Sequence, residues 1–139
     1  MLGENLELTK LTFHHVGLLV DSIESSIIHY SELFSKENIS KVYLVDSQKV
    51  KVCFVKVSDG TFIELVEPMG EESVVFKLLK KRISYYHIAY KVTDIIATVN
   101  KLELLNYKAL EYFNSEAFQG KKCIFLYTPD AHLVELIEQ

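Results

Sequence analysis

Two histidines and two glutamates recur along this chain at nearly equal spacing. His87 follows His15 by 72 residues, and Glu135 follows Glu64 by 71 residues. Imidazole nitrogens and carboxylate oxygens are donors that divalent transition metals accept. The four residues are therefore candidates for a metal site built from two equivalent halves.

The sequence around each candidate repeats as well. The matching stretches are Phe13–Ile23 with Tyr85–Ile95, Lys51–Val55 with Lys121–Phe125, and Phe62–Glu67 with Leu133–Glu138. Their offsets are 72, 70 and 71, and the offset of 70 aligns Cys53 with Cys123. Three matches in the same order at almost one offset indicate an internal duplication.

Each copy is predicted to form a strand, a helix and then three strands. Residues 13–20 are rich in β-branched and aromatic side chains, and an apolar stripe at helical spacing follows, capped by Asp21 or Ser22 and including Ile28. The second copy predicts a helix over about 94–105 with Ile96 on its stripe. The expected fold class is α+β, with two βαβββ modules that pair into a curved mixed sheet.

A chain of 139 residues suits a single domain. Within it we expect module one at about 12–68, a linker helix at about 70–82 and module two at about 84–139. The linker is expected to be helical because acidic residues stand at its start and basic residues at its end, as the helix dipole favours.

Alternation along the strands places the candidate ligands among apolar neighbours. Glu64 shares a face with Phe62 and Val66, and an unpaired carboxylate on such a face is strongly disfavoured, so a positive group should meet it. A lone strand histidine is more often structural, and a lone strand glutamate often protects an edge. Because the residues are paired by a repeat, we instead expect His15, Glu64, His87 and Glu135 to share one divalent ion, which would be Zn, Ni, Co, Mn or Fe.

Composition excludes several other classes of protein. The net charge is −4 and the basic residues are scattered, which does not suit nucleic-acid binding. No apolar run is long enough to cross a bilayer, and Met1–Lys10 lacks the pattern of a signal peptide. We therefore expect a cytoplasmic protein without a membrane partner, in which the two cysteines are reduced.

These motifs resemble those of the vicinal oxygen chelate superfamily, which includes glyoxalases, bleomycin resistance proteins and dioxygenases. The residues that carry the resemblance are His15–Gly17, Ile63–Pro68, Tyr86–Ala89 and Leu133–Leu136. Within the superfamily the chain is most similar to methylmalonyl-CoA epimerase and to glyoxalase I (lactoylglutathione lyase). The resemblance runs from about Thr12 to the C-terminus.

The resemblance implies a metal-dependent isomerase or lyase. Its metal would bind two neighbouring substrate oxygens and stabilise the enediolate that forms when a proton leaves the carbon beside a carbonyl. Return of the proton to the opposite face gives an epimerase, and return to the adjacent carbon gives glyoxalase chemistry. Glu135 is implied as both ligand and base. The implied substrate is an acyl-CoA or a thiol adduct, and the implied assembly is a homodimer.

The sequence departs from the epimerase pattern at two places. The epimerases place a second catalytic glutamate just before the third strand of module one, and counting back from Val50 puts that position on Ser47, with Asp46 beside it. The glycine-rich turn before the last strand is replaced by the shorter segment 128–132, which is more like glyoxalase and its non-catalytic relatives.

Two other functions compete with this interpretation. A non-catalytic protein of the same fold could bind a drug or metabolite, but such proteins generally lack the four ligands. An extradiol-type dioxygenase would hold Fe(II) through two histidines and one carboxylate. Glu64, as a fourth protein ligand, disfavours that function because oxygen and a catechol need open coordination positions.

Overall fold

The computed structural model describes residues 10–139. The chain forms two compact units: one runs from His15 to Tyr86, and the other joins the described residues up to His14 with His87–Gln139. Each unit contains one copy of the repeat. The prediction about a signal peptide rests on Met1–Lys10, and apart from Lys10 it lies outside the described residues.

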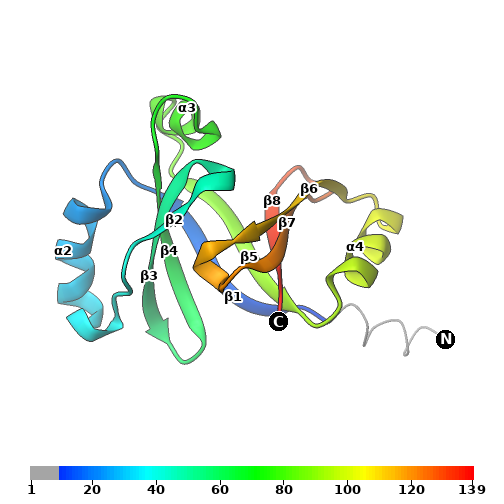
Figure 1. Ribbon diagram of the computed structural model, residues 1–139, viewed down its shortest axis with the longest axis horizontal. Helices are drawn as coiled ribbons and strands as arrows, with labels where there is room; N and C mark the ends of the chain where they lie inside the picture. Colours follow the sequence, from blue (N-terminus) through cyan, green and yellow to red (C-terminus); the bar gives the residue numbers. More distant parts are fainter. Residues whose placement is uncertain (1–9) are drawn as a thin grey trace. The chain divides into compact units, whose positions relative to one another are not determined.

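The first unit contains a mixed four-stranded sheet and two α-helices. Its elements are β1 (Thr12–Leu19, which enters the unit at His15), α2 (Ile23–Phe34), the 3-10 helices η1 (Lys36–Asn38) and η2 (Asp46–Gln48), β2 (Tyr43–Val45), β3 (Val50–Ser58), β4 (Thr61–Pro68) and α3 (Val74–Lys80). The strand order is β2-β3-β4-β1, in which β1 pairs with β4 in parallel and the other pairs are antiparallel (Figure 1).

The second unit repeats this topology. Its elements are β5 (Tyr85–Val92, which enters the unit at His87), α4 (Ile95–Leu104), β6 (Lys108–Ser115), η3 (Glu116–Phe118), β7 (Lys121–Tyr127) and β8 (Leu133–Glu138). Here β5 pairs with β8 in parallel, and β8-β7-β6 are antiparallel neighbours. The predicted α+β class and its two βαβββ modules are confirmed.

Both long helices begin at predicted caps. The side chain of Ser22 accepts a hydrogen bond from the N–H of Ser25 at 3.1 Å, and Asp94 accepts one from Ala97 at 3.0 Å. The predicted apolar stripes were too wide, because Ile28 is 69% exposed and Ile96 is 46% exposed. Each follows a sheet-facing isoleucine directly, and one residue turns the helix by about 100°.

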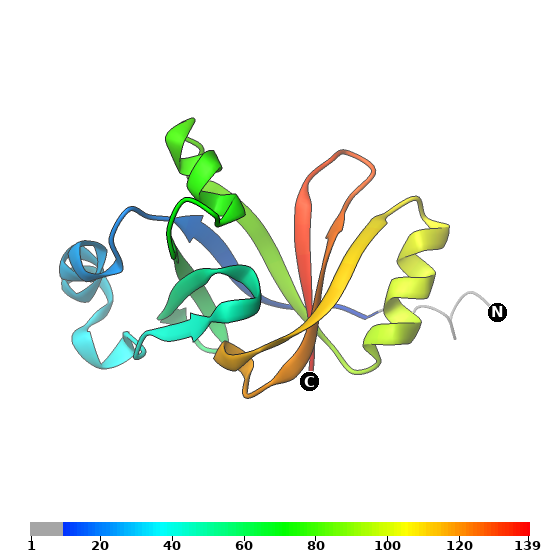
Figure 2. The same cartoon turned by 45° about the horizontal axis from the view of Figure 1, so that its top comes forward.

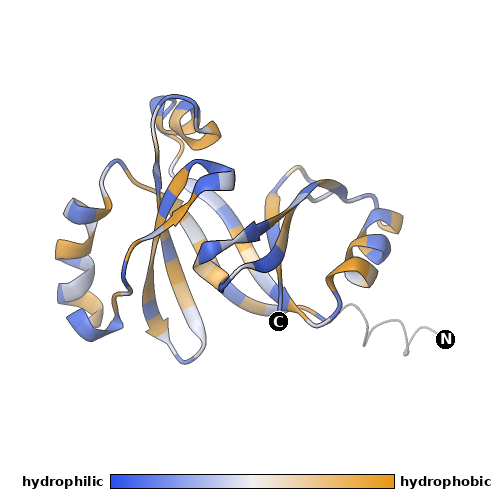
Figure 3. Ribbon diagram, viewed as in Figure 1, coloured by the Kyte–Doolittle hydropathy of each residue, from blue (hydrophilic) through white to orange (hydrophobic). Residues whose placement is uncertain are grey.

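Each long helix packs on one face of its own half-sheet. Cys53, Val55 and Leu65 form the core beneath α2, and residues of β7 and β8 form the core beneath α4. Figure 3 shows apolar bands alternating with polar ones along both helices. Because side chains alternate along a strand, Phe54 and Glu64 point to the face away from α2.

The linker helix is shorter than predicted. The sequence indicated a helix over about 70–82, whereas α3 spans Val74–Lys80. Beyond it the N–H of Ile83 donates to Leu78 O at 3.0 Å, and the N–H of Leu19 donates to Ser84 O at 2.7 Å. These bonds hold α3 at the end of the first half-sheet where β1 and β4 both finish (Figure 2).

Candidate metal centre

His15 and Glu64 form a buried pair in the first unit. Gly17 is the partner of Glu64 in the parallel ladder between β1 and β4, so His15 lies two residues earlier on the same face. His15 Nε2 is 3.3 Å from Glu64 Oε1. The histidine is 0% exposed and the glutamate 5%, so these two polar groups meet where little water reaches them.

His87 and Glu135 form the equivalent pair in the second unit. Ala89 is the partner of Glu135 in the ladder between β5 and β8, and His87 Nε2 lies 3.2 Å from Glu135 Oε1. The two residues are 1% and 4% exposed. The same atoms are therefore paired in both halves, and in each half a small residue, Gly17 or Ala89, stands opposite the glutamate.

The pair distances fit two ligands of one ion. Donors that each lie about 2.1 Å from a shared metal are about 3.0 Å apart at a right angle and about 3.4 Å apart at a tetrahedral angle. The observed 3.3 and 3.2 Å fall within this interval. A charge-assisted hydrogen bond between the same groups would be shorter, at about 2.7–2.9 Å. All four side chains are buried, and each offers a ligand atom that metals accept.

A phenylalanine covers each histidine. Phe54 lies opposite Glu64 in the β3–β4 ladder, and its ring meets the His15 ring edge-on at 5.6 Å between centroids. Phe125 lies opposite Glu135 and meets His87 in the same way at 5.2 Å. An apolar shell of this kind limits access of water to the ligands. Sequence reasoning missed both phenylalanines, although their spacing of 71 residues equals that of the glutamates.

The structure corrects the predicted alignment of the third strands. The sequence matched Cys53 with Cys123 at an offset of 70. Cys53 instead pairs with Leu65 on the face that packs against α2, whereas Cys123 pairs with Ile137 on the face of Glu135. The two cysteines are thus not equivalent, and one offset of 71 relates both strands of the β3–β4 ladder to their counterparts in β7 and β8. The coincidence of two cysteines one residue out of register produced the error.

Ser47 lies outside these pairs. It belongs to η2, is exposed, and precedes β3, whose first residue Val50 pairs with Pro68 rather than with Glu64. Asp46 is exposed on the same turn. The roles suggested for these two residues stay predictions.

The remaining histidines have other surroundings. His14, which alternates to the opposite face from His15, packs edge-on against Phe118 at 5.4 Å. His29 and His132 are exposed. The buried histidines of the described chain are therefore the two that the repeat singled out.

Comparison with known families decides the relationship. The model of the glyoxalase/bleomycin resistance protein/dioxygenase superfamily matches residues 14–127. The chain belongs to this superfamily. The match contains three of the four candidate ligands, and Glu135 lies beyond its end. The predicted superfamily is thereby confirmed.

Methylmalonyl-CoA epimerases are prominent among the similar proteins. The mitochondrial methylmalonyl-CoA epimerase of Dictyostelium discoideum is 29% identical over 130 residues, which cover 91% of this superfamily member and 77% of the relative. A Streptomyces coelicolor methylmalonyl-CoA epimerase, solved in complex with 2-nitronate-propionyl-CoA, has a TM-score of 0.81 at 24% identity and covers 94% of this chain and 99% of its own. A hypothetical protein from Bacillus halodurans C-125 has a TM-score of 0.80 at 25% identity, over 94% and 95% of the two chains. The fold is that of the glyoxalase-like proteins.

Membrane insertion through a helix finds no support in this superfamily member. Within residues 10–139, no helix combines the length and the apolar character that crossing a bilayer requires.

Proposed function

We propose that this protein is a divalent-metal-dependent isomerase of the methylmalonyl-CoA epimerase type. It would move a proton on the carbon next to the carbonyl of an acyl-CoA. The observation that carries the proposal is the buried pair of histidine Nε2 and glutamate Oε1, present once in each unit at equivalent places. A single pair would suit a structural role, but its repetition suits two halves of one ligand set.

In this proposal His15, Glu64, His87 and Glu135 bind one cation. Two imidazoles and two carboxylates suit Zn, Ni, Co, Mn or Fe and leave room for substrate oxygens. When bound, such a cation supplies Lewis acidity that makes the hydrogen beside a coordinated carbonyl more acidic. The neutral imidazoles of His15 and His87 would hold the site without adding charge, and Phe54 and Phe125 would keep water from it.

Glu135 is the proposed proton carrier. A carboxylate within reach of the acidic C–H can take the proton and return it, which is general acid–base catalysis. Glu64 would act as a ligand alone. This division of roles follows the resemblance of the Glu135 strand to the superfamily motif, and it is open to direct test.

The choice of an acyl-CoA follows the relatives, several of which are named as epimerases of such a thioester. Glyoxalase I chemistry on a thiol adduct uses the same ligand set and is the second candidate, because the short turn Thr128–His132 resembles that family. Non-catalytic binding and dioxygenase chemistry would leave the proposed proton transfer without a product. A homodimer and a cytoplasmic location remain expectations.

The test begins with elemental analysis of the purified protein, which should show about one divalent ion per chain. Exchange of substrate hydrogen with deuterated solvent is then measured with methylmalonyl-CoA and with the hemithioacetal of methylglyoxal and glutathione. Exchange into methylmalonyl-CoA alone supports the epimerase, and exchange into the hemithioacetal alone supports the second candidate. Metal-loaded protein that exchanges neither substrate contradicts the proposal.

Two glutamates on β8 provide a matched comparison. Glu135→Gln should abolish most exchange, since removal of a general base lowers rates by about 10²–10⁴-fold. Glu138 lies on the same strand but alternates to the opposite face, so Glu138→Gln should retain the wild-type rate. Equal rates in the two variants would exclude Glu135 as the proton carrier.

A further inference from the structure

A pocket of about 350 Å³ lies at the end of the first half-sheet. Its lining comes from the segment after β1, from the end of β4 and from α3. The lining residues are Asp21, Pro68, Gly70, Phe76, Leu79 and Lys80. The volume lies at the lower end of the range found for small-molecule sites.

The pocket opens on the face that carries the first ligand pair. Glu64, Val66 and Pro68 alternate onto the same face of β4, so Pro68 lies about 13 Å along the strand from Glu64 at about 3.3 Å per residue. Asp21 follows the end of β1, which is parallel to β4 and finishes beside it. A ligand held at Glu64 could therefore extend along β4 and reach the pocket.

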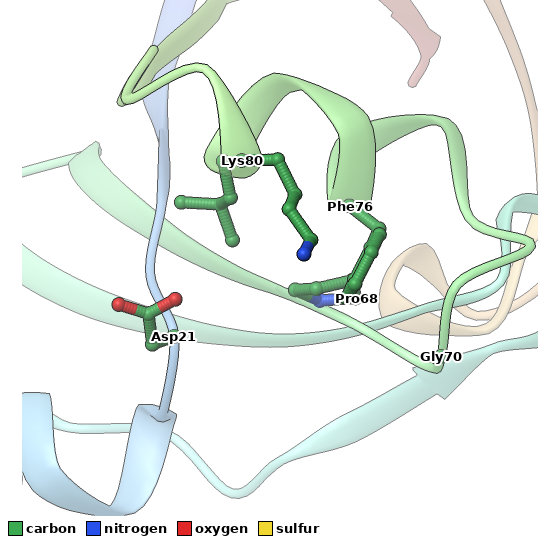
Figure 4. Close-up of a pocket in the computed structure, with 6 residues that line it drawn as sticks. Asp21, Pro68, Gly70, Phe76 and Lys80 are labelled. Carbon is green, nitrogen blue, oxygen red and sulfur yellow. The ribbon is translucent and has the colours of Figure 1, made fainter.

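The walls are apolar, with one charge of each sign. Pro68, Phe76 and Leu79 supply the apolar surface, and Figure 4 shows the Lys80 side chain pointing from α3 toward Pro68, with Asp21 and Phe76 on either side. Lys80 Nζ lies 5.6 Å from the centroid of the Phe76 ring, which helps to hold the ammonium group at the pocket.

Positive charge continues along the chain from Lys80. Lys77, Lys81 and Arg82 are exposed close to it, whereas the acidic residues of this segment, Glu71 and Glu72, precede the helix. This end of α3 therefore favours an anionic group, and the favourable field is strongest within about 10 Å at ordinary ionic strength.

We propose that this pocket binds the phosphopantetheine arm of an acyl-CoA, an inference that rests on the proposed function. The methylene segments of the arm would lie against Pro68, Phe76 and Leu79. The Asp21 carboxylate would accept a hydrogen bond from an amide N–H or hydroxyl of the arm. The Lys80 ammonium would donate to a phosphate oxygen, as a charge-assisted hydrogen bond.

This occupant fits the pocket better than simpler ligands do. A free phosphate would use Lys80 but would gain nothing from the apolar walls, and it would be repelled by Asp21. An apolar metabolite would use the walls but not the cations. The arm of an acyl-CoA combines apolar segments, hydrogen-bond donors and a terminal phosphate, and when extended it is longer than the distance from Glu64 to Pro68.

Binding can be measured without any reaction. Acetyl-CoA and S-acetylpantetheine, which lacks the phosphates, are titrated by calorimetry into the full chain with a chelator present. Lys80→Gln is compared with Lys36→Gln, a change at an exposed lysine in η1 outside the pocket. Lys80→Gln should weaken acetyl-CoA binding about tenfold, the size expected for one charge-assisted hydrogen bond. It should leave binding of S-acetylpantetheine unchanged, and Lys36→Gln should change neither.

The position of the ligand is read from backbone amide shifts. Acetyl-CoA should shift the NMR signals of Gly70 and Leu79, and Asp21→Asn should weaken both thioesters. Equal affinity of Lys80→Gln and wild type for acetyl-CoA, or shifts confined to residues outside the pocket, would overturn the inference. Because chelated protein is used, these outcomes are independent of proton exchange, so a failure of the pocket is distinct from a failure of the proposed isomerase.

Discussion

The Glu67 carboxylate accepts a hydrogen bond from the backbone N–H of Ile23 at 2.8 Å. Ile23 is the first residue of α2, whose first-turn N–H groups have no partner within the helix. Glu67 stands on β4 three residues after Glu64 and alternates to the face on which α2 packs. One strand thus presents a candidate metal ligand on one face and a helix-capping carboxylate on the other.

This bond predicts a stability effect without an effect on the candidate metal centre. Glu67→Ala should lower the free energy of unfolding by about 1 kcal/mol, because it removes both a cap and a negative charge at a helix N-terminus. Glu67→Gln keeps an acceptor oxygen and should lose less. Denaturant unfolding measures the effect, and metal content is the control. A loss of bound metal in a folded Glu67→Gln protein would contradict the separation of the two faces.

Metal binding should stabilise the folded protein measurably. A divalent ion at one hundred times its dissociation constant adds about 2.7 kcal/mol to the free energy of unfolding, so chelation should lower Tm by several degrees. His15→Ala should abolish this difference, whereas His14→Ala should retain it, since His14 packs on Phe118. Thermal scans with and without chelator decide the matter. A chelator effect that survives in a folded His15→Ala protein argues against the ligand set.

Ser47 can be tested as the second acid–base group. If it has that role, Ser47→Ala should slow interconversion of the two epimers of methylmalonyl-CoA by about 10²-fold or more while one epimer still exchanges its hydrogen through Glu135. Chiral analysis of product beside deuterium incorporation separates the two steps. Asp46→Asn tests the neighbouring residue in the same way. Unchanged interconversion in both variants would remove this turn from the mechanism.

The Cys53 thiol should be inert at neutral pH. Burial raises its pKa above the ordinary value of 9.0, and this effect outweighs the opposing hydrogen bonds with Ser40. In the unfolded chain the thiol ionises at its ordinary pKa, so the contribution of Cys53 to stability should decline as pH rises above about 9. Cys53→Ser should flatten that decline in unfolding measured between pH 7 and 10. Rapid alkylation of Cys53 in native protein at pH 7 would contradict its burial.

The sequence was sufficient to predict the two modules because each contains complete local signals. The caps Ser22 and Asp94 and the alternation around Glu64 and Glu135 are visible without any tertiary contact. The His–Glu pairing within each module was predictable as well, because the duplication repeats both residues.

Other features depended on contacts that a linear pattern does not contain. Ile28 and Ile96 suit a helical stripe, but only packing shows which side of the helix the sheet covers. The register of β3 and β7 depends on hydrogen bonds with their partner strands, which the coincidence of Cys53 and Cys123 concealed. The pocket under α3 arises from a helix position that the bonds following Lys80 determine.

The parallel pairing of β1 with β4 also affects how the chain can be made. His15 lies opposite Phe62 in that ladder, so the first strand must wait for a segment 47 residues later before its hydrogen bonds form. During synthesis, β1 is an open edge until β4 leaves the ribosome. Truncations that end before Thr61 should therefore aggregate, whereas those that end after Arg82 include every strand of the first half-sheet.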